Sequence, residues 1–299
     1  LCNSTEIAGY VTEEAAALCG LLPGTPVAGG MFDIDACALA VNVLDERNIC
    51  MIAGTWSINE YPKKTPVTDG TVLMNSLFCR PGYYLIEESS PTSAGNNAWF
   101  IANLLPEVAR DAKALGTSVY EVMNEWVAEV SAAEFVPVFL PFLMASNVHP
   151  NAKGSFVGMS MNHTRKHLAR SVYEGIAFSH RHHLEKLLAT RENLPECIRL
   201  AGGAAHSAVW TQMFADALEL PVETTAATET AALGAALAAG IGSGVYASHA
   251  AAVQQAVQVG RRHEPDGEAT PKYLARYREY VTLLEAMREP WHRLAKLGE

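Results

Sequence analysis

Residues 154–174 read GSFVGMSMNHTRKHLARSVYE and carry the strongest structural signal in this chain. Phe156 and Val157 favour a strand, and the glycines at 154 and 158 permit turns on either side of it. A helix is predicted from Thr164 onward, because apolar residues then recur at the i, i+4 spacing of a buried helical stripe. That stripe consists of Leu168, Val172 and Ile176. The stretch therefore predicts a strand, a turn and a long helix that share one core.

Strands and helices continue to alternate on both sides of this stretch. We predict strands at residues 27–32, 48–53, 83–87, 135–142, 198–201 and 222–224. We predict helices at residues 12–21, 36–44, 97–105, 118–130, 164–188, 208–218, 228–239 and 271–296. Such alternation indicates an α/β fold.

The composition excludes several classes of protein. The 299 residues are 49% hydrophobic and 18% charged, as in ordinary globular domains. The net charge of −10 argues against nonspecific nucleic-acid binding. The apolar runs at 135–145 and 231–241 are too short to cross a membrane, and the first residues lack the basic and apolar regions of a signal peptide. The six cysteines are scattered without CxxC spacing, which predicts reduced thiols and a cytoplasmic location.

The segment PVAGGMFDIDACALA, residues 26–40, offers the first candidate for chemistry. Gly29 and Gly30 let another group approach the backbone closely, and Asp33 follows near the start of a predicted helix, where a carboxylate is favoured. A plain N-cap is the more common fate of such an aspartate and remains the alternative. Asp35 is the competing carboxylate, and we expect it to cap the helix or to face solvent.

Two further strands end in glycine turns. The segment MIAGTWSINEY, residues 51–61, places Gly54 and Thr55 after an apolar strand, where backbone N–H groups and a hydroxyl form a candidate phosphate cradle. The segment IRLAGGAAHSAVW, residues 198–210, places Gly202 and Gly203 between a strand and a helix. Ser207 is either a ligand contact or simply the cap of that helix.

Two patterns suggest sites that we do not expect. The histidine pairs 163/167 and 180/183 have helical spacing, but no HExxH motif and no third ligand accompany them, so surface or capping roles are predicted. The sequence TDGT at residues 68–71 has a phosphate-loop composition, but no apolar strand precedes it. We therefore interpret these four residues as a turn.

The segment 154–174 resembles the C-terminal signature of the FGGY family of carbohydrate kinases. The matching positions are Gly154, Phe156, Gly158, Met159, His167, Leu168, Ser171, Val172, Tyr173 and Glu174. A signature of this kind marks a fold rather than a catalytic group. The resemblance implies an actin-like, ribonuclease-H-like fold and the transfer of phosphate from ATP, with Mg²⁺, to a sugar hydroxyl.

The resemblance also implies roles for individual residues. The GGxxD element of the family holds the catalytic base, which assigns this role and contact with the sugar to Asp33 rather than Asp35. Ile34 stands where many members have a polar sugar contact. Gly54 and Thr55 correspond to the loop at the β- and γ-phosphates of ATP. The adenosine loop corresponds to Gly202, Gly203 and Ser207, and residues 89–99 lie where the family has further nucleotide contacts, although Ala98 replaces a frequent glutamine. No metal ligand is assigned in this chain.

The resemblance extends from about residue 27 to residue 248 and is greatest to pentulose kinases, particularly the L-xylulose kinase branch. Residues 1–44 resemble the tail of the first kinase domain, and residues 45–299 resemble the second, nucleotide-binding domain. The Asp-x-Gly-Thr loop of the first domain is missing from the sequence. We therefore expect a missing N-terminal domain as partner and an inactive isolated chain. The resemblance leaves room for a homodimer.

Two interpretations follow for the function. The complete protein phosphorylates a sugar or polyol, most plausibly a pentulose, and this chain supplies the base and the nucleotide site. The alternative is an actin-like nucleotide-binding or regulatory protein without sugar kinase activity. Because the strands at 49–53 and 198–201 both end in glycine turns suited to one nucleotide, we predict that they belong to one sheet.

Overall fold

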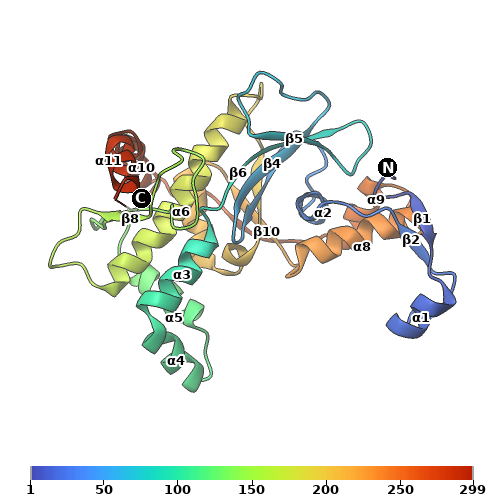
Figure 1. Ribbon diagram of the computed structural model, residues 1–299, viewed down its shortest axis with the longest axis horizontal. Coiled ribbons are helices and arrows are strands. Elements are labelled where there is room, and N and C mark those ends of the chain that lie inside the picture. Colours follow the sequence, from blue (N-terminus) through green and yellow to red (C-terminus); the bar gives the residue numbers. More distant parts are fainter. Residues whose placement is uncertain (1, 298–299) are drawn as a thin grey trace.

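The computed structural model describes residues 2–297 and is built around a seven-stranded sheet with helices on both faces (Figure 1). The order of its strands is β11-β10-β9-β3-β4-β6-β5. The bounds are β3 (Asn48–Ala53), β4 (Ser57–Lys63), β5 (Met74–Leu77), β6 (Tyr84–Ser90), β9 (Cys197–Ala201), β10 (Val222–Thr225) and β11 (Val259–His263). The predicted α/β class is confirmed.

The centre of the sheet joins two segments that are distant in sequence. β3 pairs with β9 in parallel, with Ile49 opposite Ile198 and Ile52 opposite Ala201. β10 also runs parallel to β9, whereas β4, β6, β5 and β11 are antiparallel to their neighbours. The prediction that 49–53 and 198–201 share a sheet is therefore confirmed, and both strands end at the same edge.

Each face of the sheet carries its own core, because alternate residues of a strand point to opposite faces. Ile49 and Met51 belong to a core under α6 (Arg165–Leu188), and Cys50 belongs to a core under α2 (Asp33–Ala40). In Figure 1, α6 lies on one side of the strands and α2 with α8 on the other. The remaining helices are α3 (Ala94–Leu104), α4 (Pro106–Ala114), α5 (Val119–Glu129), α7 (Ala208–Leu218), α8 (Thr230–Gly242), α9 (His249–Ala256), α10 (Thr270–Ala286) and α11 (Arg288–Ala295), together with the 3₁₀ turn η1 (Gly203–His206).

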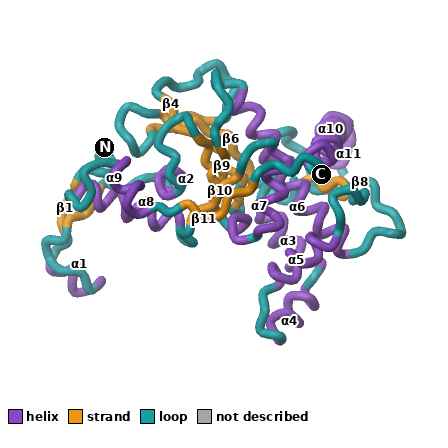
Figure 2. The backbone as a smooth tube through the Cα atoms, turned by 180° about the vertical axis from the view of Figure 1, so that it is seen from behind, coloured by secondary structure: helices purple, strands orange, loops and turns teal. Residues whose placement is uncertain are grey.

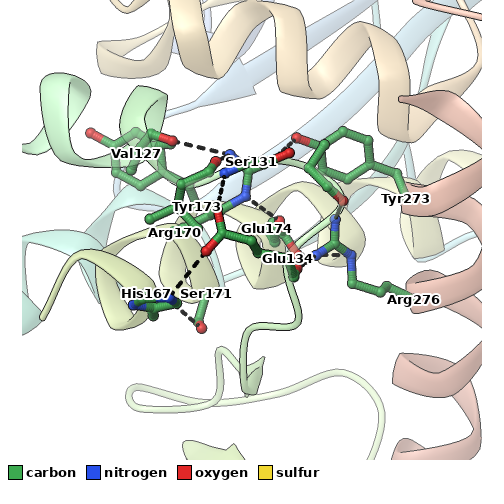
Figure 3. Close-up of polar contacts among 12 residues, drawn as sticks. Val127, Ser131, Glu134, His167, Arg170, Ser171, Tyr173, Glu174, Tyr273 and Arg276 are labelled. Atoms are coloured by element: carbon green, nitrogen blue, oxygen red, sulfur yellow. Dashed lines mark hydrogen bonds and ion pairs between the residues drawn. The ribbon is translucent and has the colours of Figure 1, made fainter. Parts of the chain in front are cut away.

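The stretch that opened the analysis forms β8 (Ser155–Val157) and the buried helix α6, as predicted. β8 pairs with β7 (Val138–Leu140), and Gly175 of α6 lies so close to the carbonyl oxygen of Phe139 that no Cβ would fit. Arg170 and Glu174 form a buried ion pair at 2.8 Å, which joins α6 to the end of α5 and to Tyr273 of α10 (Figure 3). These residues hold elements together, so the signature marks packing.

The residues before α2 form a small projection. β1 (Ile7–Tyr10) pairs antiparallel with β2 (Pro26–Ala28), and α1 (Glu13–Cys19) lies beyond them (Figures 1 and 2). Several large apolar side chains of this projection are exposed in the described part of the chain: Tyr10, Leu18, Leu21, Leu22 and Val27. Among residues 2–297, no helix combines the length and the apolar character needed to cross a membrane.

Proline explains where several predicted bounds are wrong. The strand predicted at 135–142 is reduced to three residues, because Pro137 and Pro141 flank it and cannot donate to a ladder. The helix predicted at 271–296 is two helices that meet at Met287, since Pro290 has no N–H to donate to the carbonyl of Ala286. β4 was not predicted and contains Pro62, which makes its sequence a poor match to a strand.

Candidate functional site

The loops that follow β3 and β9 are in direct contact. Gly202 has φ +83°, and a Cβ at this position would lie 2.7 Å from the carbonyl oxygen of Ala53 and 3.0 Å from the amide nitrogen of Gly54. Glycine is therefore required here both for its backbone conformation and for its size. A Cβ at the neighbouring Gly203 would meet nothing within 4 Å. The two glycine turns predicted from sequence thus lie together, and Gly203 faces open space.

A third segment supports the loop at Gly54 and Thr55. The carbonyl oxygen of Gly54 accepts a hydrogen bond from the N–H of Ala94 at 2.7 Å. A Cβ on Gly95 would lie 3.1 Å from the carbonyl oxygen of Thr55. Thr55 itself is exposed. The start of α3 therefore holds one side of the loop, while the Thr55 side chain remains available to a ligand.

A cavity of about 500 Å³ lies beside Gly203 and Ser207. The rings of Tyr173 and Trp210 form an apolar wall and stack with their centroids 4.0 Å apart. Asn124 contributes a carboxamide whose Oδ1 accepts from Ser207 Oγ at 2.6 Å and from Tyr173 Oη at 3.1 Å. An apolar slot with a few converging polar groups suits a flat heteroaromatic ligand.

Ser207 satisfies both interpretations that its sequence position allowed. It is the N-cap of α7, because its Oγ accepts from the N–H of Trp210 at 3.1 Å, and it also lines the cavity. Asn97 also lines the cavity and belongs to residues 89–99, where the resemblance implied further nucleotide contacts, whereas Asn124 and Tyr173 were not predicted. Tyr173 belongs to the stretch 154–174, which was interpreted as a fold signature, so a position in the cavity wall was not expected for it. Asn124 lies within a helix, and no motif identified it.

Asp33 is the first residue of α2, one position after the N-cap Phe32. Its side chain is exposed, and its Oδ1 accepts from the N–H of Ile34 at 3.0 Å. It lines a cavity of about 400 Å³ between β2, α2 and α8, with Gly30 and Ala235 among its neighbours. This carboxylate can therefore meet a ligand, and the helix start favours its charge.

Asp35 does not face solvent, and that expectation is wrong. Its side chain is 4% exposed, because α2 is buried between the sheet and α8 and Asp35 lies on the side toward the sheet. Glu60 and Glu87, which are opposite each other in register, lie nearby and add negative charge. Burial, together with the charges of Glu87 and Asp33, raises the pKa of Asp35 to about 7, against the opposing hydrogen bond from the Cys79 backbone N–H. Asp35 therefore cannot compete with Asp33 for a ligand in solvent.

The comparisons with known proteins agree with this geometry. Residues 49–243 match the C-terminal domain of the FGGY family of carbohydrate kinases. The chain belongs to that family. It is 36% identical to the L-xylulose/3-keto-L-gulonate kinase of Escherichia coli and 33% identical to a probable L-xylulose kinase of Haemophilus influenzae. These alignments cover 95% and 96% of this chain but 55% and 56% of the relatives, so the chain spans about half their length.

Solved structures support the same FGGY assignment. The crystal structure of xylulose kinase from Rhodospirillum rubrum superposes with a TM-score of 0.81 and 30% sequence identity. The superposition covers 97% of this chain and 57% of that protein. The predicted actin-like ATPase fold is thereby confirmed for the chain.

The two histidine pairs singled out in the sequence, 163/167 and 180/183, differ from each other. His163 accepts from the N–H of Ser160, and His167 from the N–H of Thr164, so the first pair caps a turn and a helix as predicted. His180 and His183 are wholly buried, and the surface or capping role predicted for them is wrong. The expected turn at 68–71 is confirmed, with Asp69 accepting from the N–H of Thr71. Residues 2–297 contain no group of three acidic, histidine or cysteine side chains arranged to bind a metal.

Proposed function

We propose that this chain supplies the catalytic base and the nucleotide-binding domain of an ATP-dependent sugar kinase, and that its substrate is a pentulose of the L-xylulose type. The observation that carries the proposal is the contact of Gly202 with Ala53 and Gly54. It brings a cradle for phosphates beside a cavity suited to adenine, so one nucleotide can occupy both. The L-xylulose kinases among the relatives support the choice of substrate.

The proposed nucleotide contacts follow the two loops. Adenine enters the cavity beside Tyr173 and Trp210, where Asn97 and Asn124 offer hydrogen bonds. The open space at Gly203 lets the nucleotide pass along the backbone. Gly54 and Thr55 then contact the β- and γ-phosphates through backbone N–H groups and a hydroxyl. The exposed position of Thr55 is compatible with this role.

Asp33 acts as the general base in the proposed reaction. Its carboxylate accepts the proton of a sugar hydroxyl while the hydroxyl oxygen attacks the γ-phosphorus, and the bond between the γ-phosphorus and the bridging oxygen breaks to release ADP. Such a base contributes about 10²–10⁴-fold to the rate. The exposure of Asp33 and the burial of Asp35 support this assignment.

Mg²⁺ neutralises phosphate charge in reactions of this kind. The residues of this chain do not fit a protein cage for that ion, since residues 2–297 contain no suitable cluster of three ligands. Asp33 alone offers an exposed carboxylate in its cavity. The phosphates of ATP, with residues outside 2–297, are the expected Mg²⁺ ligands.

Residues 1–44 are proposed to be the tail of a first kinase domain, and residues 45–299 the second domain. The exposed apolar side chains on α1 and its flanking turns support a partner domain at that surface. Reduced thiols and a cytoplasmic location remain predictions, compatible with six unpaired cysteines. A homodimer also remains a prediction, to be tested by sedimentation of the complete enzyme.

The complete enzyme tests the proposal through sugar-dependent release of ADP. L-xylulose, 3-keto-L-gulonate and glycerol are compared at equal concentration, with ATP in excess. We expect L-xylulose to give the highest kcat/KM and the isolated residues 1–299 to give no transfer. ATP hydrolysis that does not depend on any sugar would contradict the proposal and support a nucleotide-binding regulator instead.

A further inference from the structure

Two histidines of α6 lie at the centre of a buried polar network. His180 and His183 have relative exposures of 0% and 1%, and they point at the face of the sheet formed by β4 and β6. Every ring nitrogen has a partner on another element. The partners are Asn59, Ser57, Ser90, Ser93 and Asn147.

The hydrogen bonds around His180 define its tautomer. Asn59 Nδ2 donates to the carbonyl oxygen of Glu88 at 3.3 Å, so Asn59 Oδ1 must be the acceptor for His180 Nδ1 at 2.9 Å. His180 therefore carries its proton on Nδ1. Its Nε2 then accepts from Ser93 Oγ at 3.0 Å. Both nitrogens of this neutral ring are occupied.

His183 carries its proton on the opposite nitrogen. Asn59 Nδ2 lies 3.2 Å from its Nδ1 and can only donate, so Nδ1 is the acceptor, also within 3.0 Å of Ser57 Oγ. Nε2–H then donates to Ser90 Oγ at 3.1 Å. Asn147 Nδ2 lies 2.9 Å from Nε2, and turning this amide by 180° places its Oδ1 there as an acceptor for Nε2–H, as this tautomer requires.

These contacts reach both sides of the loop at Gly54 and Thr55. Ser57 lies directly after the loop, in register with Ala53 before it. On the other side, Ser90 and Ser93 precede Ala94, whose N–H holds the carbonyl oxygen of Gly54. A shift of either histidine would therefore be transmitted to the loop through one or two hydrogen bonds.

The two rings cannot act as catalysts or as a metal site in this arrangement. Burial lowers the pKa of His180 to about 3 and holds the pKa of His183 well below its usual range. Both rings are thus neutral at physiological pH, and their nitrogens are already used. A polar network at such depth costs desolvation, and it confers one defined geometry only when every member is satisfied.

We propose that His180 and His183 are positioning residues for the phosphate loop, residues 54–56, and that they hold it between β4 and the start of α3. This inference rests on the proposed function, because it assumes that the loop contacts phosphates. A displacement of about 1 Å at such a loop can cost on the order of 10²-fold in rate. His183 in particular contacts Ser57 and Ser90, which do not line the adenine cavity, so its loss should affect phosphate contacts more than adenine binding.

The test compares ligands with and without phosphates on the complete enzyme. His183→Leu removes every hydrogen bond of the ring. His183→Asn retains an Nδ1-like contact with Ser57, and His183→Gln retains an Nε2-like contact with Ser90. Tyr277→Phe is the matched control, since it removes a partly buried hydrogen bond between α10 and Glu185 of α6 away from the loop. Binding of ADP and of adenosine is measured by calorimetry, together with kcat and the KM for the sugar.

We expect His183→Leu to weaken ADP binding by about 10-fold and to lower kcat by up to about 10²-fold, with adenosine binding and sugar KM within about twofold of the parent. His183→Asn should recover more of the loss than His183→Gln, because Ser57 adjoins the loop. Two results would overturn the inference. One is that the variant weakens the binding of ADP and of adenosine equally. The other is that a folded His183→Leu variant binds ADP as tightly as the parent. Should His183→Leu not fold, the ADP-to-adenosine ratio of His183→Gln decides by the same criterion. Failure of the parent to prefer ADP over adenosine would instead reject the proposed function.

Discussion

Gly234 of α8 lies directly against the carbonyl oxygen of Ala36 of α2, with no room for a Cβ between them. This close crossing fixes the helix that begins with Asp33. Gly234→Ala must push the two helices apart, and overpacking of this kind typically costs 1–3 kcal/mol of stability. We expect a lower free energy of unfolding in urea and a reduced kcat in the complete enzyme. Gly267→Ala, whose Cβ would meet nothing within 4 Å, is the control and should leave both unchanged.

The neighbouring glycines at 202 and 203 should respond differently to alanine. A Cβ at Gly202 collides with the backbone of Ala53 and Gly54 and is strained at φ +83°, so Gly202→Ala should lower the urea midpoint. Gly203→Ala has room in the protein, so stability should be retained while ADP binding weakens by several-fold. Calorimetric ADP affinity and urea unfolding of both variants provide the check. An unchanged ADP affinity in Gly203→Ala would show that the nucleotide does not pass this position.

The assignment of the base can be tested by amide substitution. Asp33→Asn should lower turnover of the complete enzyme by about 10²–10⁴-fold while ADP affinity stays near that of the parent, because an amide cannot accept the hydroxyl proton. If Asp33 served only the helix terminus, asparagine would replace it almost freely. Asp35→Asn is the matched control, because an asparagine side chain resembles the protonated form of the buried Asp35. Steady-state kinetics with retained activity in Asp33→Asn would reject the assignment.

Stability should depend on pH through the carboxyl groups buried under α2. Glu60 has no ion-pair partner among the described residues, and burial, with Glu87 and Asp35, raises its pKa well above the usual range. Cys37, Cys50 and Cys79 face the same cluster, and burial also raises their pKa values. At this cluster the folded protein therefore holds more protons than the unfolded chain, in which glutamate titrates at about 4.3. The stability contributed by this cluster must fall as pH rises from this value and level off only above the folded pKa.

Glu60→Gln should reduce this loss, because the amide is neutral at every pH and has nearly the volume of the protonated acid. Urea unfolding at pH 6 and pH 8.5 measures the effect, with a smaller difference between the two expected for the variant. Glu88→Gln, on the opposite face of the sheet and paired with Lys186 at 3.0 Å, is the control and should retain the parent's pH dependence. An equal change in stability between the two pH values in the parent and in Glu60→Gln would contradict the prediction.

The sequence predicted the strand and the helix beside the site better than it predicted which polar side chains are buried. The segments 48–53 and 208–218 have the predicted bounds, because apolar runs between glycine or polar boundaries depend on local signals. Asp35, His180 and His183 were expected at the surface, since polar side chains usually are. Their burial depends on partners such as Glu60 and Asn59, which belong to other elements. The residue spacing around each buried side chain therefore does not reveal these partners. Asn124 and Tyr173 were missed as cavity residues for the same reason.

The pairing of β3 with β9 also constrains how the chain folds. Asn48 and Cys197 lie at the start of this ladder and are separated by 149 positions. On the ribosome, β3 is synthesised long before β9, so the edge of β3 that pairs with β9 stays unpaired until β9 has been synthesised. Closing a loop of that length early is entropically costly, and contacts of such long range slow folding. Until β9 is available, the unpaired edge of β3 is open to aggregation, as unpaired strand edges in general are.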